Sequence, residues 1–254
     1  MAATPAGDVD YERHGHGYAT RRRTDPRIAA HVHAALGPAR TVVNVGAGAG
    51  SYEPCDRHVV AVEPSAAMRA QRPRHLAPAL DATAERLPFG DDSFDAAMAT
   101  ITVHQWADAE RGLRELRRVS RGPVVVLTFD GDALGLFWLA EYAPDLIAAE
   151  RRRLPPIDTI ASLIGTTADV LPVPIPIDCA DGFAEAYYAR PERLLDPRVR
   201  ASQPAWGFID AAAESRAVHR LSRDLDSGAW DSRYGHLRHQ PEFAGSLRLV
   251  VGRP

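Results

Sequence analysis

The 254-residue sequence contains little cysteine and no large excess of charge of either sign. Cys55 and Cys179 are its only cysteines, which are too few for a disulfide framework or a tetrahedral zinc site and favour a reduced, intracellular protein without a bound metal. The formal net charge of -3 offers no basic surface for nucleic acid and no anchor for an anionic membrane. No apolar run approaches the ~18 residues of a membrane span, and residues 1–10 lack the apolar core of a signal peptide. These absences favour a cytoplasmic protein with a small-molecule partner.

A glycine-rich stretch lacks the endings of two common phosphate-binding loops. β-branched residues over 41–45 lead into Gly46, Gly48 and Gly50, which predicts a buried strand that turns tightly against a ligand, with a plain turn as the alternative. A dinucleotide fingerprint requires glycine where Ser51 stands, and a P-loop requires a lysine that does not follow here. The alternating glycines instead favour a nucleoside with a small amino-acid tail.

Acidic residues follow the next two expected strands. A strand over 58–62 ends in Glu63, whose carboxylate can accept hydrogen bonds from both hydroxyls of a ribose. The alternative for Glu63 is an N-cap of a helix that begins near Pro64. A further strand ends at Asp81, where the carboxylate can meet the amine of adenine and the Ala82 amide a ring nitrogen, unless Asp81 is simply a loop acid.

Three motifs together resemble the class I S-adenosylmethionine-dependent methyltransferases, in the small-molecule branch called methyltransferase type 11 or UbiE-like. The motifs are VGAGAG at 45–50, VEPSAAM at 62–68 and DATAERLPFGDDSFDAAMA at 81–99, and the resemblance covers residues 11–130. It implies S-adenosyl-L-methionine as the cofactor, with the glycine loop under the methionine moiety. The cofactor-binding residues expected near this loop and the following strands are Gly46, Ala47, Gly48, Glu63, Pro64, Met68, Asp81, Ala82 and Thr100.

The chain departs from this family two residues before the first glycine. The family usually has Asp or Glu there, and this chain has Asn44. Asparagine keeps a hydrogen-bonding oxygen but loses the charge, so Asn44 is included among the expected cofactor-binding residues with an altered role. In related methyltransferases a tyrosine and an arginine four residues later fold over the cofactor, and Tyr18 and Arg22 match that spacing. A solvated leader is the competing interpretation.

Alternating strands and helices predict an α/β, Rossmann-like fold with a seven-stranded, mostly parallel sheet and helices on both faces. We expect helices over 27–36, 108–119 and 133–153, later strands over 94–100, 124–129 and 247–251, and an extended edge over 171–178. Residues 183–230 are helical and too long for a hairpin loop, which predicts a substrate cap inserted before the last strand. The expected domains are a cofactor-covering segment (1–26), a cofactor-binding domain (27–180 and 246–254) and a helical cap (181–245).

His104 follows the fourth expected strand and is the candidate general base for an acceptor that must lose a proton. A histidine bonded to its own loop is an equal alternative. The aromatic residues of the later half either line an acceptor pocket or pack in the core, and packing is the more common role. They are Phe137, Trp138, Tyr142, Tyr187, Tyr188, Trp206 and Phe208.

We therefore expect a methyltransferase that moves a methyl group from S-adenosylmethionine to an oxygen or carbon of a small metabolite by in-line displacement. It is expected to be a monomer or homodimer without nucleic-acid or membrane partners. Two alternatives stay open. One is a protein that binds S-adenosylmethionine without transferring its methyl group, as a cyclase or binding module. The other is an NAD-dependent oxidoreductase, which the missing sixth-position glycine disfavours.

Overall fold

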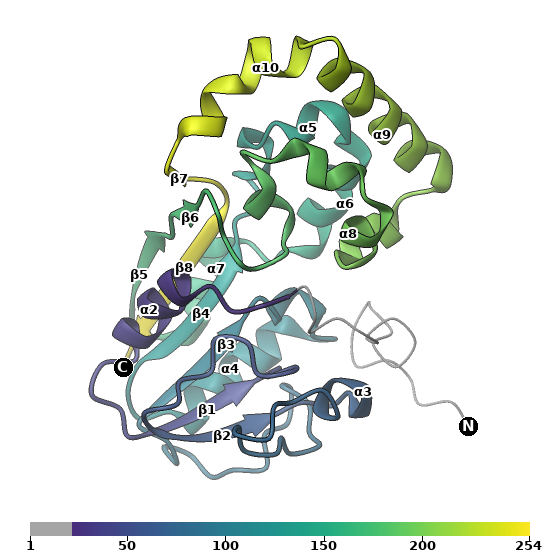
Figure 1. Ribbon diagram of the computed structural model, residues 1–254. Coiled ribbons are helices and arrows are strands. Elements are labelled where there is room, and N and C mark those ends of the chain that lie inside the picture. The colour runs from purple at the N-terminus through teal and green to yellow at the C-terminus, as the bar shows by residue number, and fades with distance from the viewer. Residues whose placement is uncertain (1–21) are drawn as a thin grey trace.

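The computed structural model describes residues 22–254, and it is built on a six-stranded sheet of order β2-β1-β3-β4-β8-β5 (Figure 1). Strands β1 to β4 pair in parallel, and β8 runs antiparallel to both of its neighbours. The strands are β1 (Thr41–Val45), β2 (His58–Val62), β3 (Ala96–Thr100), β4 (Val124–Phe129), β5 (Thr167–Pro172) and β8 (Leu247–Arg253). The predicted mostly parallel, Rossmann-like sheet is confirmed. It has six strands instead of seven, because Leu80 pairs with Val62 only as an isolated bridge.

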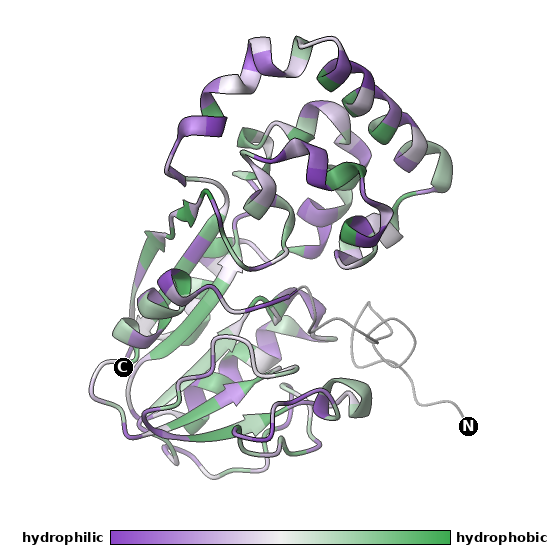
Figure 2. Ribbon diagram, in the orientation of Figure 1, coloured by the Kyte–Doolittle hydropathy of each residue, from purple (hydrophilic) through white to green (hydrophobic). Residues whose placement is uncertain are grey.

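Helices cover both faces of this sheet. Helix α2 (Pro26–Ala35) packs on one face, and α4 (Ala109–Val119) and α7 (Ile157–Ile164) pack on the other. Neighbouring residues of one strand face opposite cores: Val42 contacts the α2 side and Val43 the α4 side. Such strands are buried on both faces, which explains their continuous apolar sequences and their green colour in Figure 2.

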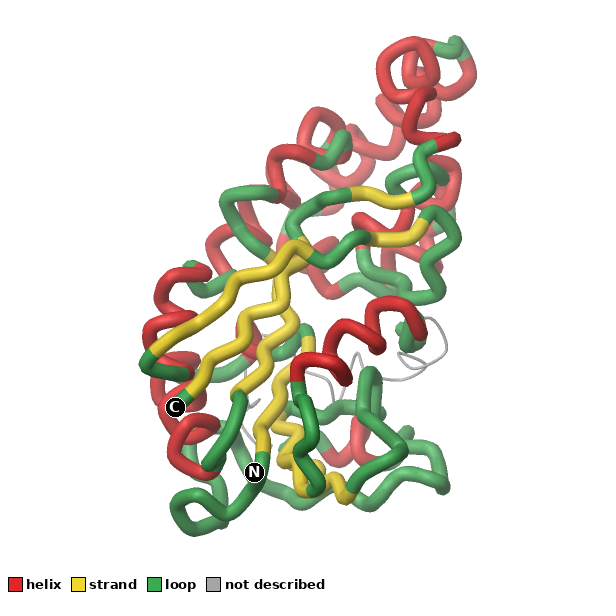
Figure 3. The backbone as a smooth tube through the Cα atoms, turned by 90° about the vertical axis from the view of Figure 1, so that its left-hand side faces the viewer, coloured by secondary structure: helices red, strands yellow, loops and turns green. Residues whose placement is uncertain are grey.

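A large helical group extends beyond one end of the sheet (Figures 1 and 3). Its first part comprises η3 (Leu134–Leu136), α5 (Leu139–Tyr142) and α6 (Pro144–Arg153). The single helix expected over 133–153 is therefore wrong: α6 begins at Pro144, whose missing N–H and preference for the first helical position interrupt the segment.

The rest of the helical group follows β6 (Ile175–Pro176) and precedes β7 (Glu242–Phe243), two short strands that pair with each other. It contains η4 (Ala184–Tyr187), η5 (Pro191–Leu195), α8 (Pro197–Ala201), η6 (Pro204–Phe208), α9 (Ala211–Asp226), α10 (Ala229–Tyr234) and η7 (Gly235–His239). Trp138, Tyr188 and Trp230 are buried in this group and belong to the same apolar core as α2. The sheet and the helical group thus share one core. Within residues 22–254, no helix is both long and apolar enough to cross a bilayer.

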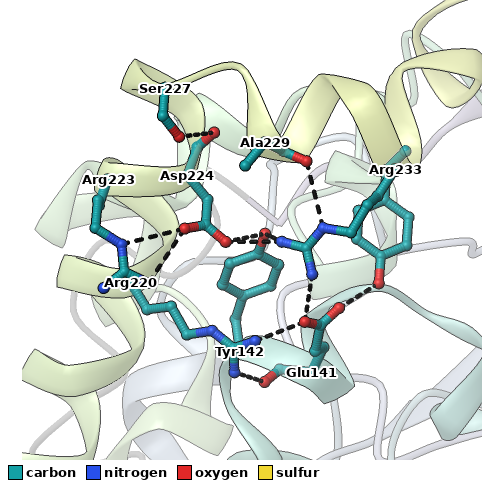
Figure 4. A network of polar contacts seen from close by, with 9 residues as sticks. Glu141, Tyr142, Arg220, Arg223, Asp224, Ser227, Ala229 and Arg233 are labelled. Atoms are coloured by element: carbon teal, nitrogen blue, oxygen red, sulfur yellow. Dashed lines mark hydrogen bonds and ion pairs between the residues drawn. The ribbon is translucent and has the colours of Figure 1, made fainter.

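A polar network ties α5, α9 and α10 together (Figure 4). The Tyr142 hydroxyl donates to Asp224 at 3.1 Å, and Arg233 donates to both of these residues, at 2.6 and 2.7 Å. Glu141 accepts from Arg220 at 2.5 Å and also pairs with Arg233. These contacts hold the outer helices of the group on its first helices.

Candidate active site at the carboxyl edge of the sheet

The glycine loop follows β1 at the carboxyl edge of the parallel strands. Gly46, Gly48 and Gly50 have φ of +67°, +50° and +99°, a region that side chains with a Cβ rarely adopt. A Cβ on Gly46 would lie 2.2 Å from Oγ1 of Thr102. The glycine loop therefore packs closely against the loop that follows β3. The Ala47 amide donates to the Val62 carbonyl at 3.0 Å and joins the loop to β2. Glycine therefore suits all three positions, because it adopts positive φ without strain.

Glu63 lies at the end of β2 and faces this loop. One carboxylate oxygen accepts from the Gly48 amide at 2.8 Å and the other from the Ser65 amide at 2.9 Å. Burial raises the pKa of Glu63, and these two amides oppose that shift. The N-cap of α3 (Ala66–Arg69) is Ser65, whose Oγ accepts from the Met68 amide. The N-cap alternative for Glu63 is therefore wrong.

Asn44 lies beneath the loop and is fully buried. Its Nδ2 donates to Glu53 Oε2 at 3.1 Å, and Glu53 pairs with Arg72 at 2.9 Å, with side chains only 2 % and 4 % exposed. The Oδ1 atom of Asn44 has no hydrogen-bond partner among residues 22–254. The negative charge expected at position 44 is thus present nearby on Glu53, where Arg72 neutralises it. Sequence reasoning missed both residues, although an acid three positions after the last glycine was visible.

The remaining expected cofactor contacts surround Glu63 and the loop. Asp81 follows Leu80, whose carbonyl accepts from the Glu63 amide at 3.0 Å. The side chain of Asp81 is 71 % exposed and pairs with Arg69 at 2.9 Å, while Ala82 is half-buried. The Pro64 carbonyl accepts from Arg69, and Met68 packs beside Gly48. Thr100, the last residue of β3, forms a long 3.5 Å hydrogen bond to the Ser51 carbonyl.

Arg22 reaches the site from the start of the described chain, whereas Tyr18 lies outside the described residues. Arg22 Nε donates to Asp181 Oδ1 at 2.6 Å, and the hydroxyl of Tyr52 donates to Asp181 Oδ2 at 2.7 Å. Burial and the adjacent Asp181 raise the pKa of Tyr52, which keeps it a hydrogen-bond donor. Asp181 therefore joins Arg22 to Tyr52, which follows the glycine loop. No sequence motif indicated Asp181.

A cavity lies between the carboxyl edge of the sheet and the helical group, with an empty volume of about 690 Å³ including its open mouth. Its lining includes Ile101 after β3, Phe129 at the end of β4, and Phe183 from the helical side. His104, in η2 (Val103–Gln105), also lines it. Ile101 has φ of +52°, a strained conformation for a β-branched residue and one that is concentrated at functional sites.

Most of the aromatic residues of the later half pack in the core, which is the more common role of aromatic side chains. Phe137 lines the cavity. The buried aromatics Trp138, Tyr142, Tyr187, Tyr188 and Trp206 belong to the main apolar cluster. Phe208 is partly exposed and lies under the guanidinium of Arg153, 4.2 Å from its ring centre. Among residues 22–254, no group of three potential ligands is arranged for a metal ion.

This glycine loop, the buried acid at the end of β2 and the antiparallel β8 within a parallel sheet define the class I fold of S-adenosylmethionine-dependent methyltransferases. Residues 43–126 match the sequence profile of the methyltransferase domain family of type 11. This part of the chain is a methyltransferase domain of that family, as its motifs predicted.

The curated relatives share only this part of the chain. Demethylmenaquinone methyltransferase of Mycolicibacterium paratuberculosis is 32% identical over 108 residues, which are 40% of this chain and 47% of that protein. The enzyme of the same name from Mycobacterium tuberculosis gives the same identity over 46% of its length. The chain thus spans about half the length of the curated relatives it matches.

Solved structures extend the likeness to the helical group. A methyltransferase assigned to an antibiotic biosynthesis pathway of Anabaena variabilis superposes with a TM-score of 0.83 and 28% identity, over 92% of this chain and 99% of that one. A [4+2]-cyclase covers 90% of this chain with a TM-score of 0.51 and 16% identity, a level that shows the shared fold alone.

Proposed function

We propose that this protein transfers a methyl group from S-adenosylmethionine to an oxygen or carbon of a small molecule bound between the sheet and the helical group. The observation that carries the proposal is the Glu63 carboxylate, held by the Gly48 and Ser65 amides at the carboxyl edge of the sheet. In open α/β sheets this edge is where ligands bind. Each Glu63 oxygen accepts one of these amides and retains capacity for a ribose hydroxyl.

The residues present fit the cofactor. Asn44 Oδ1 is a buried acceptor without a partner among residues 22–254, and a cationic amino group would satisfy it. The glycine loop has the open backbone that a bound methionine moiety requires, and Gly46, Ala47 and Gly48 would hold it. Asp81 and Ala82 would meet the adenine. When bound, S-adenosylmethionine supplies a methyl group on a positively charged sulfur.

Other residues complete the proposed cofactor site. Pro64, Met68 and Thr100 would contact the cofactor from the ends of β2 and β3, and Tyr18 with Arg22 would cover it. We assign residues 1–26 to this covering segment and residues 181–245 to the substrate cap, on a cofactor-binding domain formed by 27–180 and 246–254. His104 would accept a proton from the acceptor, since it lines the cavity from η2.

Calorimetry with S-adenosylmethionine, S-adenosylhomocysteine and NADH tests the cofactor. We expect both sulfur nucleosides to bind and NADH not to bind. Glu63→Gln should weaken S-adenosylhomocysteine binding at least tenfold, because it removes the charge that strengthens two ribose hydrogen bonds. Glu110→Gln, an exposed carboxylate on α4, is the matched control and should change nothing. Preferential binding of NADH would overturn the proposal.

A product-mass screen tests methyl transfer. Candidate metabolites, beginning with demethylmenaquinone because of the curated relatives, are incubated with the cofactor and examined for a gain of one methyl group. His104→Ala should lower turnover about a hundredfold and leave S-adenosylhomocysteine affinity within about twofold. Cofactor binding without any methylated product across the screen would favour the cyclase or binding-module alternative, and unchanged turnover of the variant would return His104 to a structural role.

A further inference from the structure

Glu185 is a buried carboxylate on the wall of the acceptor cavity. It lies in η4, is 3 % exposed, and lines the cavity. Among residues 22–254, its hydrogen bonds come from Ser246 alone: the amide donates to each oxygen at 3.0 Å, and Oγ donates at 2.9 Å. Among residues 22–254 no cation forms an ion pair with it, and Arg248, which acts on it through space, pairs with Asp130. A buried carboxylate without a cation is costly unless a ligand uses it.

The neighbouring backbone leaves space for the carboxyl group of Glu185. A Cβ on Gly245 would lie 2.7 Å from Glu185 Oε2, so glycine at 245 makes room for the carboxyl group. Burial raises the pKa of Glu185 to about 7, and the Ser246 hydrogen bonds oppose this shift. Near neutral pH the group is therefore a strong hydrogen-bond acceptor for part of the time and a neutral acid otherwise.

Gln203 supplies a second unused polar group on the same cavity. Its side chain is 5 % exposed, and its Oε1 accepts from Trp206 Nε1 at 3.2 Å. Its Nε2 has no hydrogen-bond partner among residues 22–254. A buried amide donor left without a partner is destabilising, and an acceptor oxygen on a ligand would satisfy it.

Building on the proposed methyl transfer, we propose that the cavity selects a neutral, largely apolar acceptor with a hydroxyl group bonded to Glu185 and a carbonyl oxygen bonded to Gln203. The apolar lining, which includes Phe129, Phe137 and Leu146, encloses the rest of the molecule. The cavity opens to solvent between the sheet and the helical group, so a ligand can enter it from that side. Glu185 and Gln203 act here as specificity determinants, and the methyl transfer itself remains with the groups near η2.

The other charged groups at the cavity favour a neutral acceptor. Arg22 pairs with Asp181, and Arg153 pairs with Glu150, so these lining charges are already compensated. His104 is the remaining titratable group on the lining. An ammonium would have to be desolvated on entering this apolar, already paired lining, whereas a hydroxyl donates to Glu185 without that cost.

Binding of matched naphthalenes to the protein saturated with S-adenosylhomocysteine tests this inference. The probe is 6-acetyl-2-naphthol, which carries a hydroxyl and a carbonyl on a flat apolar frame. Its methyl ether lacks the hydroxyl hydrogen, 2-naphthol lacks the carbonyl, and 2-naphthylmethylamine replaces the hydroxyl by an ammonium. We expect fluorescence titration to give an affinity for the probe at least tenfold above each of the three comparison compounds.

Two variants assign these preferences to residues. Glu185→Gln should reduce the preference for hydroxyl over methyl ether to less than threefold, and Gln203→Met should reduce the preference over 2-naphthol in the same way. Glu242→Gln, an exposed carboxylate in β7, is the control and should keep both preferences. Because the two variants test separate contacts, misfolding of one leaves the other informative.

Several outcomes would overturn the inference. They are no binding of 6-acetyl-2-naphthol, tighter binding of the amine, and preferences that persist in both variants. Failure of S-adenosylhomocysteine to bind would instead contradict the proposed function. Cofactor binding combined with an absent hydroxyl preference would contradict this inference alone.

Discussion

The cofactor side and the acceptor side of this site are built in different ways. On the cofactor side, the backbone of the glycine loop is fixed by positive φ angles and by its contacts with Glu63 and Thr102. These residues belong to the short segments that end three adjacent strands. On the acceptor side, the cavity lining comes from residues spread between Arg22 and Ser246, and its polar character comes from side chains such as Glu185. The first side depends on backbone shape and the second on side-chain identity.

The two sides also treat buried charge differently. Beneath the glycine loop, Glu53 is paired with Arg72 and bonded to Asn44, so the charge is neutralised within the protein. In the cavity, Ser246 is the one residue within the described part of the chain that hydrogen-bonds Glu185. Beneath the loop both buried charges are used within the protein, whereas a carboxylate without a cation leaves interaction energy for a ligand. The comparison predicts that substitutions on the two sides affect different measurements.

Gly46→Ala should give the largest effect on the cofactor side. The new Cβ would meet Thr102 Oγ1 at 2.2 Å in a conformation of φ +67°, so the loop must move. We expect S-adenosylhomocysteine affinity to fall about a thousandfold, which is about 4 kcal/mol, as measured by calorimetry. Gly37→Ala is the matched control, because Gly37 has φ of +58° but no atom within 4 Å of the new Cβ.

The control separates backbone strain from steric contact. Gly37→Ala should cost about 1 kcal/mol in the free energy of unfolding through its left-handed backbone and leave affinity within about twofold. Equal losses of affinity in the two variants would break the proposed link between loop shape and cofactor binding.

Local spacing explains why the cofactor side could be predicted from the sequence. The β-branched run over 41–45 and the alternating glycines form a strand and loop because neighbouring residues determine both. Glu63 was predicted to lie at the end of β2 because its position follows directly from the strand before it. Even here, the sequence did not indicate that Glu53 carries the negative charge absent from Asn44, since this depends on a contact across the loop.

The acceptor side could not be predicted in the same detail. Glu185 contacts Ser246 across 61 positions, and Arg22 contacts Asp181 across 159. No periodic pattern records such contacts, because they arise when separate elements pack together. The sequence indicated a helical insertion before the last strand, but the break at Pro144 and the polar ends of the cavity required the structure.

Glu185→Gln should reveal the buried charge of the acceptor side as a pH-dependent stability. Burial raises the folded pKa of Glu185 from its ordinary 4.5 to about 7, with Ser246 opposing the shift. Between these pH values the folded protein binds more protons than the unfolded chain. The contribution of Glu185 to the free energy of unfolding is therefore fully present below pH 4.5 and is lost as the pH rises through about 7. The difference amounts to ~3 kcal/mol.

Urea unfolding of the wild type and Glu185→Gln at pH 5 and pH 8 measures this effect. We expect the variant to gain stability relative to the wild type at pH 8 and not at pH 5. Glu110→Gln, exposed on α4, should follow the wild type at both values. Identical pH dependence in the wild type and Glu185→Gln would show that the carboxyl is not destabilised by burial, and the contrast between the two sides would disappear.

Asn44→Asp tests whether the cofactor side tolerates the acid that its family usually carries. Asn44 Nδ2 donates to Glu53 Oε2 at 3.1 Å, so an aspartate would place a second carboxylate against Glu53 with Arg72 as the cation already in use. Like charges this close oppose each other. We expect the free energy of unfolding at pH 8 to fall by about 1–2 kcal/mol, with S-adenosylhomocysteine affinity unchanged within about threefold. The double variant Asn44→Asp, Glu53→Gln removes the repulsion and should recover most of the stability. A tenfold rise in affinity for S-adenosylhomocysteine without loss of stability would contradict this expectation. It would show that Glu53 does not supply the negative charge that the family usually carries at position 44.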